Sequence, residues 1–178
     1  YYNTALGKDA LSTNTLSSLN VAIGHSALKT LSAGGSETHN VAVGANAGLS
    51  ITTGIRNTII GGIAGDALTD ADYNVAMGYQ ALTTDTLGSR SVAIGYSALR
   101  DQSFTTATDT YNTAVGYQAG TAVSTGTLNT LIGGLAGDAI TTGGSNVALG
   151  YFALTADDVG SKSVAIGTAA LGDQNLAT

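Results

Sequence analysis

Short apolar runs return along the chain at nearly constant intervals. Each run follows an Asn or Ser, holds three mostly apolar residues and closes at a Gly, as in "NVAMGYQAL" from residue 74 and "NVALGYFAL" from residue 146. An amphipathic helix would need apolar residues three and four apart over at least ten residues. Runs this short, rich in Val and Ile and closed by Gly, instead predict short β-strands that lead into turns.

Aligning these runs gives ten copies of the pattern N-[VT]-A-[IVLM]-G-x-x-A-[LG]. The spacing is 17 residues, except for 20 after the second copy and 21 after the sixth, and the fifth and eighth positions are always Gly and Ala. Repeats of this kind predict identical coils that stack and bury a face together. We therefore expect an all-β fold, a parallel β-solenoid or left-handed β-roll over residues 1–178, with coils starting near Asn3, Asn20, Asn40, Asn57, Asn74, Ser91, Asn112, Asn129, Asn146 and Ser163.

A longer period lies over the short one. The extra residues after the second and sixth copies predict inserted loops at 32–38 and 103–110, and residues 40–111 repeat at 112–178 with an offset of 72. The last residues match the start of the second loop, so we expect the chain to be a fragment of a longer fibre.

The columns of the alignment predict where side chains point. Because residues two apart share a face of a strand, the Val/Thr and Ile/Val/Leu/Met columns should share one face. The Ala between them should face the opposite wall of the coil or a neighbouring chain, and association of chains is expected through this Ala face. The invariant Gly should mark a corner with positive φ or a close backbone approach. The Asn column should bond turn backbone groups.

Volume exchanges between columns indicate a shared core. Where the middle Ala is replaced by Ile59 or Leu131, Gly occurs at 62 and 65 or at 134 and 137. Further along the coil an apolar residue (Ile51, Leu68, Val123 or Ile140) is displaced by two positions in other coils, to Leu16, Leu87 and Val159. A displacement of two predicts that these residues stay on the same face.

Composition and charge exclude several classes of partner. The chain carries a net charge of −6 with only six Lys and Arg, which argues against nucleic acid, whose phosphates need clustered basic residues. No apolar run approaches the ~18 residues of a membrane span. With 25 Gly and no Cys or Pro, the chain has no disulfide, and its β-branched residues argue against disorder.

The repeat resembles a known family. "SVAIGYSAL", "SVAIGTAAL" and "NVAIGHSAL" are similar to the N-S-V-A-I-G repeat of YadA-like heads of trimeric autotransporter adhesins, and related repeats occur in phage tail fibres. The resemblance implies a left-handed β-roll that forms homotrimers along a fibre, lies outside the cell or on a virion, and binds host matrix. The chain departs from that family in two ways. Its coil has 17 residues whereas the family coil has about 14, and it has a four-coil period.

Residues with catalytic chemistry are few. His25 and His39 occupy different columns, which does not favour a triad or a metal cage. The pairs Asp70 with Asp72 and Asp157 with Asp158 would need a shared cleft to act as acid and base. Asp66 and Asp138 recur at one place in related coils, in a spacing that resembles neither an EF-hand nor the nonapeptide calcium roll. The sequence predicts no enzyme, cofactor or metal site.

Aromatic residues are the better candidates for contacts. The column after the invariant Gly holds a tyrosine in four coils, and such a stripe suits either sugar rings or the joint between chains. The inserted loops are a second place for recognition, and Phe104 is their aromatic residue. The candidate ligand or interchain contact residues are Tyr79, Tyr96, Tyr117, Tyr151 and Phe104.

Three functions are compatible with these features. The first is a segment of an extracellular trimeric fibre, a bacterial adhesin or phage tail fibre, whose partners are its own copies and a host protein or glycan. The second is an ice-binding solenoid, although the regular Thr column (Thr4, Thr58, Thr113 and Thr130) is expected to face inward. The third is a glycan-binding tailspike segment, with or without a catalytic acid pair.

Overall fold

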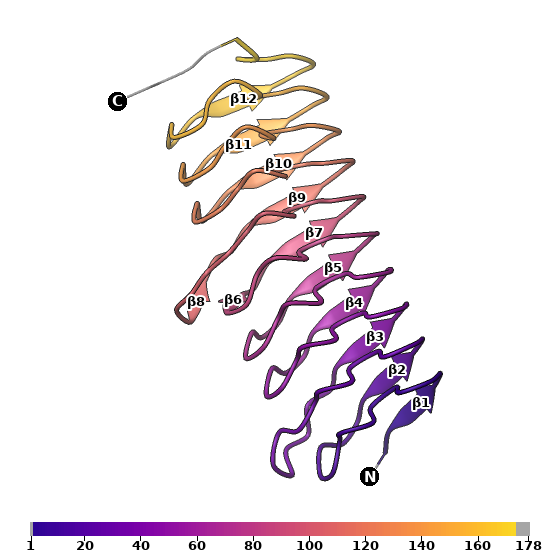
Figure 1. The fold of residues 1–178 in the computed structure, drawn as a ribbon. Helices are drawn as coiled ribbons and strands as arrows, with labels where there is room; N and C mark the ends of the chain where they lie inside the picture. The colour runs from indigo at the N-terminus through magenta and orange to yellow at the C-terminus, as the bar shows by residue number, and fades with distance from the viewer. Residues whose placement is uncertain (1, 174–178) are drawn as a thin grey trace.

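Each apolar triplet forms a three-residue strand that pairs in parallel with the triplet of the next coil. In the computed structural model, which describes residues 2–173, these strands make one ten-stranded sheet in which equivalent residues of successive coils are partners (Figure 1). Its strands are β1 (Thr4–Leu6), β2 (Val21–Ile23), β3 (Val41–Val43), β4 (Thr58–Ile60), β5 (Val75–Met77), β7 (Val92–Ile94), β9 (Thr113–Val115), β10 (Thr130–Ile132), β11 (Val147–Leu149) and β12 (Val164–Ile166).

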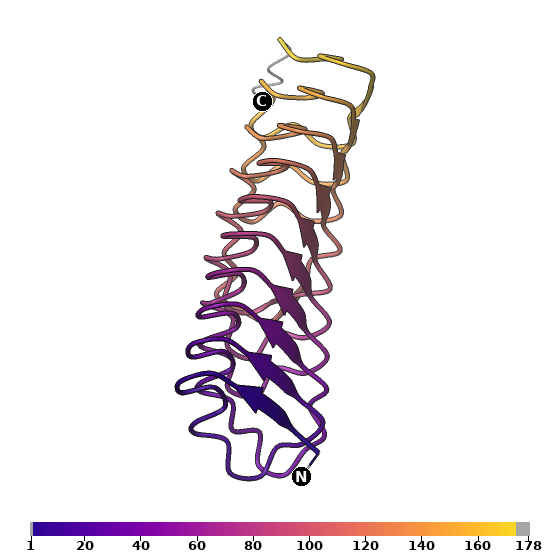
Figure 2. The same cartoon turned by 90° about the vertical axis from the view of Figure 1, so that its right-hand side faces the viewer.

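The described part of the chain is thus an all-β parallel solenoid of about ten coils, as the repeat predicted. Strand follows strand along a rod (Figure 2). With strands about 4.8 Å apart, ten coils span roughly 48 Å. Residues 2–173 contain no helix, and hence none long and apolar enough to cross a membrane.

The inserted loops join the stack at one corner. Here β6 (Gly88–Ser89) pairs in parallel with β8 (Thr108–Asp109), which lies within the loop 103–110. At the other insertion Glu37 forms a single parallel bridge with Ser18. The extra residues therefore extend the wall of the coil that carries them.

The middle Ala of each strand lies inside the coil, which corrects the expectation of an interface through the Ala face. Ala22, Ala42, Ala76, Ala93 and Ala114 are fully buried within one chain. The invariant Ala of the eighth position is also buried in the interior coils, as at Ala27 and Ala153. Both Ala columns form the solenoid's narrow core together with Leu28, Leu82, Leu99 and Leu154.

The exchange of volume between columns is confirmed. A Cβ on Gly65 would lie 2.9 Å from Leu68 Cδ1 and 3.1 Å from Ile59 Cδ1, so the larger core side chain needs a glycine beside it. The same arrangement surrounds Gly137 in the later unit. Gly62 and Gly134 have a different role, because each lies under a tyrosine ring of the next coil.

The expectation that the displaced apolar residues stay on the same face is wrong. Leu16 and Val159 are 46% and 36% exposed, whereas Ile51 and Leu68 at the earlier position are fully buried. The chain turns between these positions, so they do not share a face. In the coils with a displaced apolar residue, the core position is instead occupied by Asn14, Asp85 or Asp157.

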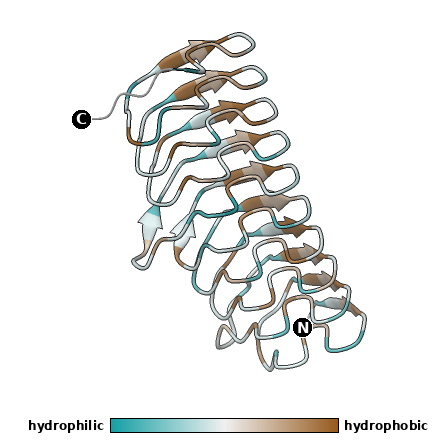
Figure 3. Ribbon diagram, turned by 45° about the horizontal axis from the view of Figure 1, so that its top comes forward, coloured by the Kyte–Doolittle hydropathy of each residue, from teal (hydrophilic) through white to brown (hydrophobic). Residues whose placement is uncertain are grey.

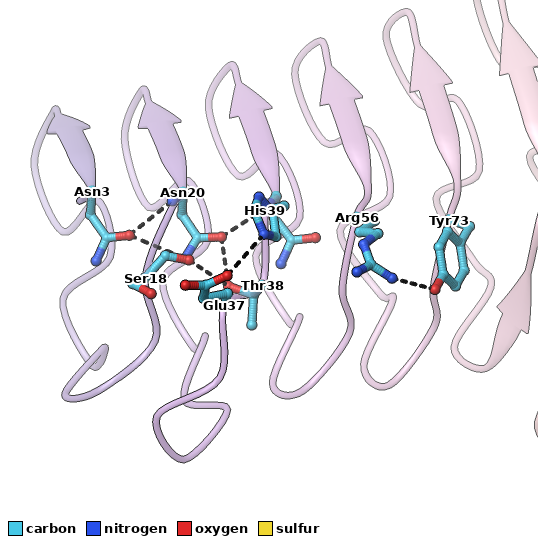
Figure 4. A network of polar contacts seen from close by, with 9 residues as sticks. Asn3, Ser18, Asn20, Glu37, Thr38, His39, Arg56 and Tyr73 are labelled. Carbon is cyan, nitrogen blue, oxygen red and sulfur yellow. Dashed lines mark hydrogen bonds and ion pairs between the residues drawn. The ribbon is translucent and has the colours of Figure 1, made fainter. Parts of the chain in front are cut away.

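Asparagines directly before eight of the ten strands form an internal ladder, as predicted. Asn57 Nδ2 donates to the Ala71 carbonyl at 2.7 Å, and Asn57 Oδ1 accepts the Asn74 backbone N–H at 2.9 Å. The same pair of bonds recurs in neighbouring coils, and Figure 4 shows its beginning at Asn3 and Asn20. These amides satisfy backbone groups that the three-residue strands leave free inside the coil.

Candidate functional site

The candidate functional surfaces lie on the outside of the rod. Within residues 2–173 no pocket is detected, and no group of three or more His, Asp or Glu side chains is placed to hold a metal ion. The outward face of the sheet and the exposed side chains beside it are therefore the sites to consider.

The first surface is the outward face of the sheet, made by the first and third residues of its ten strands. In every strand except the terminal β1, whose three residues are all exposed, these residues are half-buried or exposed while the residue between them is buried, so the predicted shared face of the Val/Thr and Ile/Val/Leu/Met columns is confirmed. Met77, Ile132 and Leu149 are 36%, 37% and 44% exposed although each is flanked by strands on both sides. Figure 3 shows these strands as a hydrophobic band along the rod.

The Thr residues belong to this same outward face, which corrects the expectation that they point inward. Thr58, Thr113 and Thr130 are the first residues of β4, β9 and β10, each half-exposed beside a buried neighbour. Thr alternates there with Val, so the face is a regular array of methyl groups with a few hydroxyls.

The second surface is the tyrosine stripe, comprising Tyr79, Tyr96, Tyr117 and Tyr151, where the sequence predicted it. These side chains follow the strands and are 44–55% exposed. The rings of Tyr79 and Tyr96 stack with centroids 5.8 Å apart, and those of Tyr96 and Tyr117 with centroids 5.3 Å apart. Tyr151 packs edge-on against Phe152 at 4.3 Å. Three tyrosines thus form one continuous stack along the rod.

The third surface is an arginine–tyrosine stripe, comprising Arg56, Tyr73, Arg90 and Tyr111, which was not predicted. It lies at the opposite end of the strands, because each member is the last residue before a strand's Asn or Ser. The Arg56 Nη1 donates to the Tyr73 hydroxyl at 2.5 Å (Figure 4). The Arg90 guanidinium lies 5.0 Å from the Tyr73 ring centroid and 5.8 Å from that of Tyr111. Distances below about 6 Å are those of cation–π pairs.

An ion pair anchors Arg90 at the centre of this stripe. Arg90 Nε donates to Asp109 Oδ1 at 2.8 Å, and this hydrogen bond raises the pKa of Arg90. The alternation of Arg and Tyr in the last column of four successive coils was visible in the sequence and could have identified the stripe.

Phe104 does not join these surfaces. Its side chain is 7% exposed, and its backbone N–H donates to Asp85 Oδ1 at 3.1 Å. The loop 103–110 turns its aromatic residue into the coil, which leaves polar residues outside. We therefore exclude Phe104 from the surface candidates.

The carboxylates singled out in the sequence lie at separate places. Asp70 accepts the Thr53 hydroxyl at 2.5 Å and is exposed, whereas Asp72 accepts the Ile55 N–H at 2.7 Å. Asp157 is fully buried and accepts the Gly160 N–H at 2.8 Å. Burial raises the pKa of Asp138. These bonds to backbone and hydroxyl groups are those of turn and core residues.

Polar residues that the sequence did not single out form a cluster inside the coil. Gln102 Nε2 donates to Asp85 Oδ2 at 2.6 Å and to Ser91 Oγ at 2.9 Å, and Gln102 Oε1 accepts from Asn112 Nδ2 at 2.8 Å. Ser91 replaces Asn in the ladder, so the Gln102 amide takes the place of the missing one. The same residue types recur at Asp157, Ser163 and Gln174, the last of which lies outside the described residues.

Comparison with known proteins identifies no relative. No protein-family model, curated protein sequence or solved structure matches the chain. The arguments about function therefore rest on the surfaces described above.

Proposed function

We propose that the chain is a segment of an extracellular trimeric fibre, of the kind found in bacterial adhesins and phage tail fibres, which projects or displays receptor contacts. One observation carries the proposal. The outward face presents twenty side chains in two columns along the whole rod, most of them apolar, and no other part of residues 2–173 covers it.

The size of this face favours a partner. Its two columns cover about 48 Å by 10 Å, or on the order of 500 Å², which is at the upper end of the largest apolar patch on a typical monomer. Beside β5, β7 and β9 the two stripes widen this strip to roughly 20 Å over about 14 Å of the rod, which brings the total to about 620 Å². Stable interfaces bury about 800 Å² on each partner.

Self-association suits the geometry of the face. A flat strip with a constant repeat matches another copy of itself along its full length, and a rod built this way is stiff. A fibre of several such rods would carry repeated weak contacts whose avidity adds up. The acidic, Lys- and Arg-poor composition makes nucleic acid a poor partner.

Light scattering on the wild-type chain and on Ile94→Asp tests the assembly. Ile94 is the third residue of the central strand β7 and points outward. We expect a wild-type mass near three times 17.6 kDa, about 53 kDa, and a monomer for Ile94→Asp with an unchanged circular dichroism spectrum. Thr105→Asp, in the exposed part of the inserted loop, should remain a trimer. A wild-type mass of 17.6 kDa would reject the proposal.

Ice binding is a second candidate, favoured by one observation. Thr58, Thr113 and Thr130 lie on the outward face, where their hydroxyl groups stand in a column of regularly spaced methyl groups. A thermal-hysteresis assay decides between the two functions. Ice binding predicts hysteresis in the wild-type chain and its loss in Thr113→Tyr, whereas a fibre whose outward face is covered should show none.

A further inference from the structure

The two stripes stand at the same level of the rod on opposite edges of the sheet. Tyr73 and Tyr79 bracket β5, Arg90 and Tyr96 bracket β7, and Tyr111 and Tyr117 bracket β9. These three strands are consecutive neighbours in the sheet. Beside the other described strands at least one of the two bracketing residues is small, aliphatic or polar.

We propose that, in the assembled fibre, the arginine–tyrosine stripe of one chain packs against the tyrosine stripe of the neighbouring chain at the level of β5, β7 and β9. This inference rests on the proposed self-association and adds the residues that align the chains. Arg90 lies at the centre of its stripe and Tyr96 at the centre of the stack, so the contact is centred on these two residues.

The two stripes complement each other chemically. The tyrosine stripe offers exposed rings that are electron-rich on their faces and hydroxyls, while the other stripe offers guanidinium groups and further rings. Arg90 has 41% of its side chain exposed although it is paired with Asp109. Within one chain the stripes lie beyond opposite ends of the strands, six residues apart in sequence and at most about 20 Å, with the strand between them, so they meet only between chains.

Symmetry determines which stripes meet. Rotation about an axis parallel to the rod brings opposite edges of two chains together at equal height, so one chain's Arg90 faces the neighbour's Tyr96. A two-fold axis across the rod would instead place each stripe on itself in reversed order. The coincidence of level on opposite edges is useful only in the first arrangement, which is the parallel one expected for a fibre.

Cysteine crosslinking tests the contact directly, because the chain has no native cysteine. The double variant Arg90→Cys, Tyr96→Cys is treated with a short bis-maleimide and run on a denaturing gel. Its two thiols lie too far apart to bridge within one chain, so we expect covalent dimers and trimers. A mixture of the two single variants should give crosslinked dimers, and each single variant alone should give none.

A matched control tests whether the two chains meet at the same height along the rod. In Arg90→Cys, Tyr151→Cys the second thiol lies three strands further along the sheet, about 14 Å away along the rod, so crosslinking should be nearly lost. Equal crosslinking in this control, or a single variant that crosslinks to itself, would overturn the inference. A trimeric mass without any Arg90–Tyr96 crosslink would also overturn it while leaving the proposed fibre intact. A monomeric mass would reject the fibre itself.

The strength of the contact gives a second readout. Arg90→Ala should raise the dissociation constant by about 3-fold to 30-fold for each Arg90–Tyr96 contact in the oligomer, the range of one cation–π pair. Lys29→Ala is the matched control, since Lys29 lies in neither stripe and pairs with Asp9 at 3.9 Å. Equal dissociation constants for the two variants would show that the Arg90 stripe does not contribute.

Discussion

Replacement of Gly61 by Ala tests why the fifth position of every coil is glycine. Gly61 has a φ of +136°, a conformation that a residue with a side chain rarely adopts. A Cβ there would lie 2.5 Å from the carbonyl oxygen of Gly78 in the next coil, where ordinary contact begins at 3.4 Å. The two coils would have to separate by about 0.9 Å, the difference between these distances.

That separation breaks the ladder at this point. The Gly78 N–H donates to the Ile60 carbonyl and the Thr58 N–H to the Asn74 carbonyl, both at 2.8 Å and both between these two coils. Lengthening such bonds by 0.9 Å places them outside hydrogen-bonding range. The unfavourable backbone conformation costs about 1–3 kcal/mol and each lost bond about 0.5–1.5 kcal/mol, so Gly61→Ala should lower the unfolding free energy by about 4 kcal/mol.

Guanidinium titration followed by circular dichroism measures this loss, and the neighbouring residue provides the control. Gly62 has no positive φ, and a Cβ on it would lie 3.5 Å from the Tyr79 ring, an ordinary contact. Gly62→Ala should therefore leave the unfolding free energy within about 1 kcal/mol of the wild type. Gly34→Ala, with φ +62° and no atom within 4 Å of its Cβ, should show the conformational penalty alone, about 1–2 kcal/mol. Equal losses for Gly61→Ala and Gly34→Ala would refute the role of the carbonyl.

Three further substitutions test the interior. Asn129→Ala leaves a buried backbone N–H and a buried carbonyl without partners, so it should lose about 2–4 kcal/mol of unfolding free energy in the same titration, while exposed Ser145→Ala should change little. Burial raises the pKa of Asp138, so its ionised form lowers stability once the pH rises above the unfolded value of 3.8. Asp138→Asn should thus raise the unfolding free energy at pH 7 by up to about 1 kcal/mol and leave it unchanged well below pH 3.8, and a gain at both pH values would contradict this sign. Replacing Asp85 and Gln102 together by Leu should preserve the unfolding free energy better than Asp85→Leu alone, yet lower the yield of refolded chain recovered by size exclusion.

The period of the sequence predicted most of the architecture because each coil repeats the same constraints. An apolar triplet bounded by Asn and Gly can only be a short strand at a corner, and ten copies of it must stack. Which side of the strand is the core could not be predicted from alternation alone. Ala occupies the inside because the opposite wall comes close, which leaves the larger Val and Ile side chains outside, the reverse of the usual preference.

Backbone conformation is the part of the structure that the sequence does not predict. Within residues 2–173, 25 residues other than glycine have positive φ, including Leu28, Arg90 and Tyr111, although this costs an L-residue about 1–2 kcal/mol. The structure explains the repetition, because such residues donate their N–H to the neighbouring coil, as Leu28 does to the Ala47 carbonyl at 3.1 Å. A coil that adopts this conformation favours it in the next, which no local sequence signal reveals.

The candidate surfaces were also predictable to different degrees. A tyrosine stripe was visible because one residue type recurs in one column. The arginine–tyrosine stripe alternates two residue types, so its column was visible but less conspicuous, and the structure adds that Arg90 lies between two rings. Phe104 was misplaced because the composition of a loop does not report which of its residues turns inward.

Near-identical coils can stack in more than one register, and the buried polar cluster distinguishes the correct register from the others. A strand that slips by one whole coil keeps almost all of its apolar contacts, so the hydrophobic pattern alone specifies register weakly. Asp85 and Gln102 break this degeneracy, since their column neighbours on the far sides are the apolar Leu68 and Val123. In a slipped stack the Asp85 side chain would face an apolar residue and lose the Gln102 donor at 2.6 Å, which leaves the buried Oδ2 without a hydrogen bond. A polar group that adds little to stability in the correct register thus makes incorrect registers costly, and the return of its residue types four coils later in the sequence marks the chain at an interval longer than a single repeat.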